Sequence, residues 1–347
     1  MRNGYIGSAF RIPIDVRRKQ MAEKIRAGVL GISHAHAIGK LRTIQASPEY
    51  ELVGICEPDA ELQQQRKDEE VFKGVRWLSE RELLGDDTVR VIAVEGRVQD
   101  NLALAKRAVE AGKHVHLDKP AGESLEKFKS LLNLVKRENL LLQMGYQFRY
   151  NPGFELAMKA VNDGWLGEIF FVHGSIGSTI NPESRRRLAF HPGGMMFELA
   201  CHLIDTLVAL LGRPEKVTPF MRHDADLDDQ LADNTLAVFQ FERAIAVMES
   251  AAMEIEAGQR RKLEICGTEG TIVVQPIEPP AVRLCLNQAH EDFQKGWQSV
   301  SVPNIPRYVR DFEELARCVR GEQQPSYSLE HDFIVQETLL RACGTLM

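Results

Sequence analysis

Short apolar runs alternate with longer segments of helical composition through the first 144 residues, and this alternation constrains the fold more than any other feature. The strand-like runs cover residues 27–32, 50–56, 75–77, 89–94, 115–117 and 140–144. The helical segments between them cover residues 35–46, 60–73, 79–85, 99–111 and 124–138. Strands separated by helices pair in parallel, and helices then cover both faces of the sheet. An α/β domain with a parallel sheet is therefore predicted.

The pattern changes after Pro152, where strands begin to follow one another without helices between them. These strands are predicted at residues 168–178, 215–222, 234–242, 244–253, 260–266, 270–275 and 281–287. Helices are predicted at residues 154–163, 194–211, 308–320 and 329–344. Consecutive strands of this kind form an antiparallel sheet with helices on one face. The second part of the chain is thus predicted to be an α+β domain built on an open, mostly antiparallel sheet.

Size and charge exclude several classes of protein. The chain has 347 residues, more than one domain usually holds. Its net charge of −6 gives no basic footprint, so nucleic acid is not expected as a partner. No apolar run approaches the roughly 20 residues of a membrane span, and no signal-peptide core precedes residue 25. The six cysteines contain no C-x-x-C pair, which favours reduced thiols in a cytoplasmic protein without membrane contact.

The turn after the first strand-like run is the first candidate site. In a dinucleotide-binding fold this turn holds phosphate groups against the N-terminus of a helix. Of the fingerprint G-x-G-x-x-G, the chain keeps Gly31, but has Ser33 at the second position and His36 at the third. Ser33 is small enough to let a pyrophosphate approach, whereas His36 should loosen the packing of helix on strand.

Glu57 ends the second strand-like run. A carboxylate at this place accepts hydrogen bonds from both ribose hydroxyls and repels a 2′-phosphate, so NAD is favoured over NADP. The alternative is an ordinary solvated turn residue. The cofactor-binding residues predicted for the whole domain are Gly31, Ile32, Ser33, His34, Glu57, Val94, Asp118 and Lys119.

Lys119 follows the strand-like run 115–117, at the sheet edge where α/β proteins bind ligands. Pro120 comes next and favours an extended backbone at Lys119. A lysine at the mouth of a cleft can donate to a substrate oxygen or stabilise an alkoxide. The alternative is an ordinary surface lysine.

A second candidate site lies on the predicted helix 194–211. Glu198, His202 and Asp205 stand at i, i+4 and i+7, so one helical face carries all three. A carboxylate one turn before an imidazole can orient the ring, which suits a proton-transfer site. The alternative is a buried histidine with a purely structural role.

Five runs of residues resemble one family. The run Ala108 to Pro120 is similar to A-x-E-A-G-K-H-V-x-x-E-K-P, with Asp118 in place of Glu. The run Gly193 to Asp205 is similar to G-G-x-x-x-D-x-x-x-H-x-x-D, with Glu198 in place of Asp. Residues 148–152 and 164–169 are similar to the start of the second domain in that family, and residues 267–270 match its G-T-x-G turn. Over about residues 26–345 the chain resembles the glucose-fructose oxidoreductase, inositol dehydrogenase and MocA (Gfo/Idh/MocA) family.

The resemblance implies a function. It implies an NAD(H)-dependent oxidoreductase that transfers a hydride between nicotinamide and a sugar, polyol or related cyclic hydroxy compound. His202 would act as acid and base, Lys119 would hold the reacting oxygen, and Glu198 would orient His202 or bind a neighbouring hydroxyl. Weaker candidates for lining the substrate pocket are Arg149, Tyr150 and His191.

The resemblance also implies a domain organisation. Residues 1–25 are an N-terminal arm, residues 26–148 a Rossmann NAD(P)-binding domain, and residues 149–347 a substrate-binding and oligomerisation domain. An open sheet needs a partner to cover its free face. A homodimer or homotetramer through that sheet is therefore expected.

Departures from the family pattern keep alternatives open. The family's T-P-N-H-x-H loop is replaced by residues 96–101. Two alternatives are a tightly bound NAD used for transient oxidation during elimination or glycoside cleavage, and a silent sugar or NAD sensor. A zinc site on Glu198 and His202 would need a further ligand such as His191. No third ligand is clear, so no metal is expected. The arginine run 185–187 is interpreted as solvated, with contact to an acidic substrate or a subunit as the alternative.

Overall fold

A computed structural model describes residues 23–346, and these form two compact units. The first unit comprises residues 23–147 and 306–337, and we call it the Rossmann unit. The second comprises residues 148–305 and 338–346, and we call it the sheet unit. Almost all of the predicted arm, residues 1–25, lies outside the described residues.

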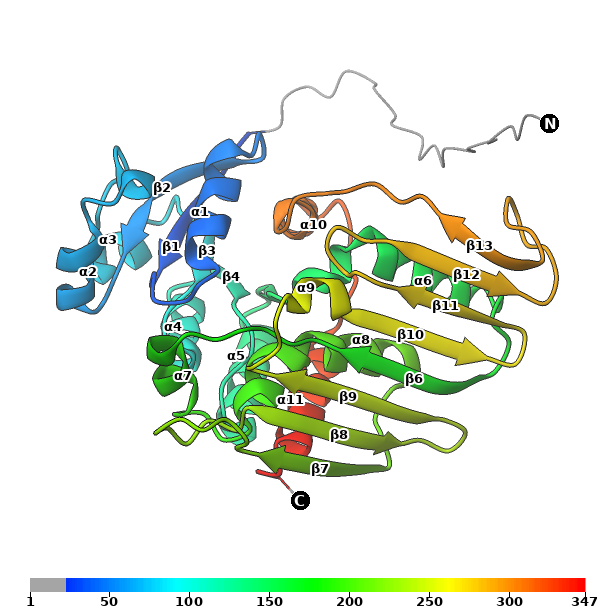
Figure 1. Cartoon of the computed structure of the whole chain (residues 1–347). Coiled ribbons are helices and arrows are strands. Elements are labelled where there is room, and N and C mark those ends of the chain that lie inside the picture. The colour runs from blue at the N-terminus through cyan, green and yellow to red at the C-terminus, as the bar shows by residue number, and fades with distance from the viewer. Residues whose placement is uncertain (1–22, 347) are drawn as a thin grey trace. The chain divides into compact units, whose positions relative to one another are not determined.

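The Rossmann unit contains a five-stranded parallel sheet in the order β2-β1-β3-β4-β5 (Figure 1). Its strands are β1 (Ile25–Leu30), β2 (Tyr50–Cys56), β3 (Val91–Val94), β4 (His114–Leu117) and β5 (Leu142–Met144). Its helices are α1 (Ala37–Ala46), α2 (Ala60–Arg66), η1 (Glu70–Phe72), α3 (Glu80–Gly85), α4 (Val98–Glu110), α5 (Leu125–Arg137) and α10 (Val309–Val319). The predicted parallel α/β sheet is confirmed. The prediction of a strand at residues 75–77 was wrong, because only Trp77 forms a β-bridge there, with Ile55.

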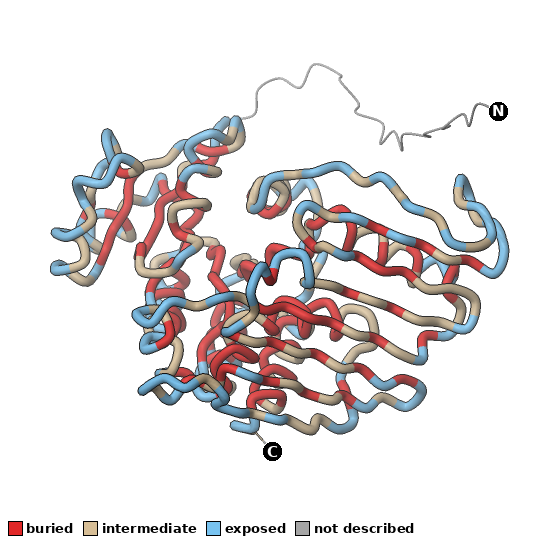
Figure 2. Tube along the Cα trace, viewed as in Figure 1, coloured by how far each residue is buried: buried red, intermediate tan, exposed pale blue. Residues whose placement is uncertain are grey.

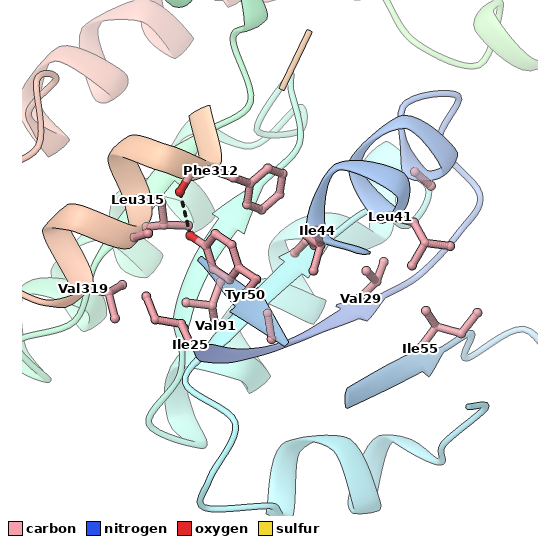
Figure 3. Packing of buried hydrophobic residues seen from close by; sticks show 14 of the residues in the cluster. Ile25, Val29, Leu41, Ile44, Tyr50, Ile55, Val91, Phe312, Leu315 and Val319 are labelled. Atoms are coloured by element: carbon pink, nitrogen blue, oxygen red, sulfur yellow. Dashed lines mark hydrogen bonds between the residues drawn. The ribbon is translucent and has the colours of Figure 1, made fainter. Parts of the chain in front are cut away.

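A late segment of the chain completes the core of the Rossmann unit (Figure 3). Phe312 of α10 packs against Tyr50 of β2, and the Tyr50 hydroxyl donates to the Phe312 carbonyl at 2.8 Å. Leu315 and Val319 of the same helix join the cluster that holds Ile25. Burial of these apolar side chains makes α10 part of the same fold as β1 and β2.

The sheet unit contains eight strands in the order β13-β12-β11-β10-β6-β9-β8-β7. The strands are β6 (Ile169–Ser175), β7 (Lys216–Arg222), β8 (Asn234–Gln240), β9 (Ile245–Ala251), β10 (Lys262–Gly267), β11 (Gly270–Val274), β12 (Val282–Leu286) and β13 (Gly296–Val300). Only β6 and β9 pair in parallel. The predicted mostly antiparallel sheet is confirmed, but β13 was missed because Trp297 is the one large apolar residue before its end.

Helices cover one face of this sheet. The sheet unit contains the helices α6 (Pro152–Asn162), α7 (Pro182–Leu188), η3 (Met196–Ala200), α8 (Cys201–Leu211) and α9 (Ala257–Arg260), with most of η2 (Gln147–Tyr150). The helix α11 (Leu329–Ala342) begins in the Rossmann unit and ends in the sheet unit. Residues alternate along the strands between a buried face, with Phe239 and Met248, and an open face, as Figure 2 shows. On the open face Phe220, Ile245 and Trp297 are each about half exposed.

The predicted helix 194–211 is not one regular α-helix. Its first part, η3, is a π-helical segment, and the α-helix α8 begins at Cys201. A π-helical turn is wider than an α-helical one and often occurs at functional positions. No helix in the described part of the chain combines the length and the apolar character that a membrane crossing requires.

Candidate functional site

The turn after β1 is locked to the ends of β2 and β3. Gly31 has a φ of +87°, and a Cβ there would lie 2.5 Å from the amide nitrogen of Gly96. Gly31 N donates to Cys56 O at 2.7 Å, and His34 N donates to Glu95 O at 3.0 Å. The strand order reverses between β1 and β3, so this turn lies at the point where open α/β sheets bind ligands.

Glu57 supports this turn. The residue is 8% exposed; its Oε2 accepts from Ile32 N at 2.7 Å and its Oε1 accepts from Asp59 N at 2.9 Å. A carboxylate oxygen can accept more than one hydrogen bond, so both oxygens keep capacity for ribose hydroxyls. The alternative of a solvated turn residue is wrong, and the ribose role stays a prediction.

A pocket of about 320 Å³ opens beside Glu57. Its lining includes Ser33, Gly96, Arg97 and Leu104. These residues fit the adenosine half of NAD: an acid for the ribose, small residues beside the phosphate turn, and an apolar wall for the base. Arg97 Nε donates to Asp100 Oδ2 at 2.7 Å, so the replacement loop 96–101 is itself ordered at this pocket.

A buried group of charges lies beside the same turn. Lys40 of α1 is fully buried, and its Nζ donates to Glu95 Oε1 and to Asp118 Oδ1, both at 2.7 Å. His36 Nδ1 lies 3.2 Å from Asp118 Oδ1, and His34 Nδ1 is in close contact with Asp118 Oδ2. A Cβ at Gly145 would come within 2.9 Å of both Asp118 and Lys40. Asp118 is therefore fixed by packing and by several hydrogen-bonding partners.

The electrostatics of this group follow from burial and mutual pairing. Burial opposes the charge of Asp118, but His34 and Lys40 hold the pKa of Asp118 well below its usual value. Burial also opposes the charge of Lys40, but Asp118 and Glu95 together raise its pKa. Burial and the charge of Asp118 raise the pKa of Glu95 to about 8, against the effect of Lys40. Burial lowers the pKa of His36 to about 4 although Asp118 opposes the shift.

Lys40 and Glu95 were missed by reasoning from the sequence. A signal for Lys40 existed, because it shares a helical face with Ala37, Leu41 and Ile44, which are all buried. A lysine on the apolar face of a helix needs a buried acidic partner. Glu95 follows the apolar strand β3 directly and is the natural candidate for that partner.

Lys119 is buried rather than solvated, so the surface-lysine alternative is wrong. The loop that follows it is held by Gln336, which is 1% exposed. Ala121 N donates to Gln336 Oε1 at 3.3 Å, and Gln336 Nε2 donates to Gly122 O. Gln336 was also missed, because nothing in the sequence links a glutamine near residue 336 to the loop after β4.

The glycine turn before η3 is packed closely in the sheet unit. Gly193 and Gly194 have φ values of +88° and +44°, and a Cβ at Gly194 would lie 2.4 Å from Ala232 O. Glu198 is half-buried in η3, and His202 lies at the start of α8 with 2% of its surface exposed. The His202 ring centroid is 5.0 Å from that of Phe148.

Arg149 and Asp205 form a buried ion pair. Arg149 Nη2 donates to Asp205 Oδ1 at 2.7 Å, and Arg149 Nε donates to the same carboxylate. Bidentate pairs of this kind hold geometry firmly. Arg149 therefore anchors the start of the sheet unit to α8, and its predicted contact with substrate stays a prediction.

The remaining candidates lie in the same unit. His191 is 7% exposed and stacks on Phe197, with ring centroids 5.3 Å apart, while Tyr150 is half-buried.

The expectation of a solvated arginine run was wrong for Arg185. It is 1% exposed and pairs with Asp229 and Asp233 at 2.7 Å, because α7 packs on the loop before β8.

The structure gathers the predicted residues within each unit. Residues predicted to bind the cofactor surround the carboxyl ends of β1 to β4 in the Rossmann unit: Gly31, Ile32, Ser33, His34, Glu57, Val94, Asp118 and Lys119. The remaining candidates lie before, within or just after η2, η3 and α8 in the sheet unit: Arg149, Tyr150, His191, Glu198 and His202.

Family models match both parts of the chain. Residues 25–146 match the model described as "Oxidoreductase family, NAD-binding Rossmann fold", and residues 154–273 match the "GFO/IDH/MocA C-terminal domain". Together with the fold and the dinucleotide turn, these matches define an NAD-binding oxidoreductase. The chain belongs to the Gfo/Idh/MocA family. The predictions of family, fold class and nicotinamide cofactor are confirmed.

Known proteins agree with this assignment. The chain is 22% identical to scyllo-inositol 2-dehydrogenase (NAD(+)) of Bacillus subtilis over 320 residues, which cover 88% of this chain and 89% of that protein. It is 31% identical to the uncharacterized oxidoreductase YhhX of Escherichia coli over 151 residues, 43% of this chain and 44% of that one. The fold matches levoglucosan dehydrogenase, solved with NADH and levoglucosan, with a TM-score of 0.79, 19% identity and coverage of 93% and 97%.

Proposed function

We propose that this chain is an NAD(H)-dependent dehydrogenase of a sugar, polyol or related cyclic hydroxy compound. The observation that carries the proposal is the placement of Lys119, a buried lysine after the carboxyl end of β4, directly after Asp118, whose carboxylate contacts His34 of the dinucleotide turn. The names of two relatives, an inositol dehydrogenase and a levoglucosan dehydrogenase, favour this substrate class. Residues 26–148 would hold the cofactor, and residues 149–347 would hold the substrate.

The side chains would divide the chemistry between them. NAD, when bound, accepts the hydride from the substrate carbon. Lys119 would hold the hydroxyl oxygen through Nζ and offset its negative charge as the carbonyl forms. His202 would take the hydroxyl proton during oxidation and return it during reduction. Glu198 would orient His202 or bind a neighbouring hydroxyl.

The proposal requires Lys119 and His202 to act on the same substrate, and paired variants test this. A panel of inositols, levoglucosan, hexoses and polyols is offered with NAD while NADH absorbance is followed. We expect Lys119→Ala and His202→Ala each to lower kcat by a factor of about 10² to 10⁴ while NAD binding remains measurable.

Two substitutions serve as matched controls: Lys127→Ala on the exposed side of α5, and His290→Gln in the loop before β13. Both should keep kcat near the wild-type value. Near-normal turnover in Lys119→Ala or His202→Ala would remove that residue from the mechanism. Conversion of substrate by the wild-type protein without net NADH would favour transient oxidation, and binding without any turnover would favour a sensor.

A further inference from the structure

Three side chains converge between the turn after β1 and the end of β4. One possible ligand atom each from His34, His36 and Asp118 lies within 4.8 Å of the others. His36 Nδ1 is 3.2 Å from Asp118 Oδ1, and His34 Nδ1 contacts Asp118 Oδ2. The two imidazole rings are 4.6 Å apart at an angle of 72°. Both rings thus direct a nitrogen at one carboxylate.

Two of these residues are departures from the patterns that the rest of the chain follows. His36 stands where the dinucleotide fingerprint has its third glycine, and Asp118 stands where the E-K-P run has Glu. They are 82 positions apart in the sequence and in direct contact in the structure. The two residues that depart from these patterns are therefore neighbours in space.

We propose that His34, His36 and Asp118 bind a divalent transition-metal ion of the zinc type. Two imidazoles and one carboxylate form a ligand set that zinc uses when a fourth position stays open. Zinc lies about 2.0–2.2 Å from such ligands, so tetrahedral ligand atoms are about 3.3–3.5 Å apart. The 3.2 Å between His36 Nδ1 and Asp118 Oδ1 is close to that separation, and the ligand atom of His34 lies within 4.8 Å of both others.

The surroundings of Asp118 resemble the outer shell of a metal site. Ligating carboxylates are usually held by a further hydrogen bond. Lys40 supplies it at 2.7 Å, and the same ammonium group donates to Glu95 at 2.7 Å. The Asp118 side chain is completely buried, whereas those of His34 and His36 are 9% and 15% exposed, so an ion would enter from the imidazole side.

The position of the site has a consequence for the cofactor. The ion would lie in the turn where Rossmann folds hold the pyrophosphate, so ion and NAD should exclude one another. This competition rests on the proposed function. The metal site itself does not, because it can be measured with metal alone.

Direct titration tests the site. Full-length protein, first treated with EDTA, is titrated with CoCl₂ while visible d–d absorption is recorded, and with ZnCl₂ in a calorimeter. We expect one ion per chain and a visible band of low-coordinate cobalt. His34→Gln and His36→Gln should each weaken binding at least about tenfold, whereas the control His290→Gln should bind as the wild type does.

Failure of the wild type to take up one ion, or wild-type affinity in both histidine variants, overturns the proposal in favour of a closed hydrogen-bond network. Far-UV circular dichroism checks the fold of each variant, and His34→Gln carries the test if His36→Gln does not fold.

NAD affinity should fall about tenfold in saturating zinc. Unchanged NAD affinity with metal bound would overturn the competition alone, and absence of NAD binding without metal would count against the proposed function instead.

Discussion

Single residues at the ends of strands set the chemistry of the Rossmann unit. Glu57 follows β2 and hydrogen-bonds the backbone of the turn after β1, so this side chain shapes the turn, and its carboxylate is predicted to bind the cofactor. Gly31 lets the same turn approach the loop after β3 within backbone contact. Gly31 therefore sets the geometry of the turn, and Glu57 is predicted to set the choice of cofactor.

Removal of the charge of Glu57 should change the choice of cofactor. In Glu57→Gln one acceptor oxygen remains, but the repulsion of a 2′-phosphate and one of the two backbone hydrogen bonds are lost. We expect NAD affinity to fall and the preference for NAD over NADP to shrink by roughly tenfold. Binding titrations of both nucleotides measure this, with the exposed Glu61→Gln as control. An unchanged preference would end the assignment of Glu57 to the ribose.

The close approach at Gly31 can be separated from its backbone conformation. Gly31→Ala adds a Cβ that would lie 2.5 Å from Gly96 N, whereas Gly74→Ala, at a φ of +75°, meets nothing within 4 Å. Both changes cost about 1–2 kcal/mol of backbone strain. We expect Gly31→Ala to lose about 2 kcal/mol more in urea unfolding and to weaken NAD binding strongly. Equal losses in the two variants would contradict the close approach.

Sequence reasoning found the residues of the site more readily than their partners. Gly31, Glu57 and Lys119 could be predicted because a strand end or a motif marks each one. Gln336 could not be assigned a role, because its partners lie far away in the sequence and only the folded chain brings them together. Long-range polar contacts of this kind leave no periodic pattern.

At the scale of elements, the type of each strand and helix was predictable, whereas irregular or short elements were not. The alternation of apolar runs with helical segments predicted the parallel sheet, and the consecutive strands after residue 214 predicted the antiparallel one. The π-helical segment η3 was missed because a widened turn has the same residue composition as an α-helix. The short helix α7 was missed because three arginines suggest a solvated loop, although Arg185 is buried.

Arg185 joins α7 to the loop before β8 and should be needed for stability. It pairs with Asp229 and Asp233, so Arg185→Ala would leave two buried carboxylates without their cation. Loss of one partner of a buried pair costs about 3–5 kcal/mol. Urea unfolding should show this loss. The neighbouring Arg186→Ala, on an exposed residue, should change stability by less than about 0.5 kcal/mol. Similar effects of the two substitutions would refute the anchoring role.

At the scale of the whole molecule, the open face of the sheet unit has the character of an interface. Phe220, Ile245 and Trp297 are 53%, 50% and 59% exposed on strands β7, β9 and β13. Apolar residues spread across one sheet face are typical of surfaces that a partner covers. The predicted homodimer or homotetramer would cover this face.

A charge on the open face should dissociate the predicted oligomer. We expect Ile245→Lys to shift the wild-type oligomer towards monomer in sedimentation velocity, because burial of an unpaired ammonium group opposes association. Phe190→Lys, on a residue 64% exposed outside the sheet, should leave the oligomer intact. A wild-type protein that sediments as a monomer would contradict the prediction.

The helix α10 belongs to the Rossmann unit although it lies late in the chain. This affects how the unit folds during synthesis and how it can be expressed on its own. A ribosome has to synthesise residues up to Val319 before Tyr50 meets Phe312, so the nascent unit stays unfinished until almost the whole chain has emerged. A fragment ending at residue 147 would expose the apolar surface that α10 covers. Any separately expressed cofactor unit should therefore carry residues 306–337 on a linker.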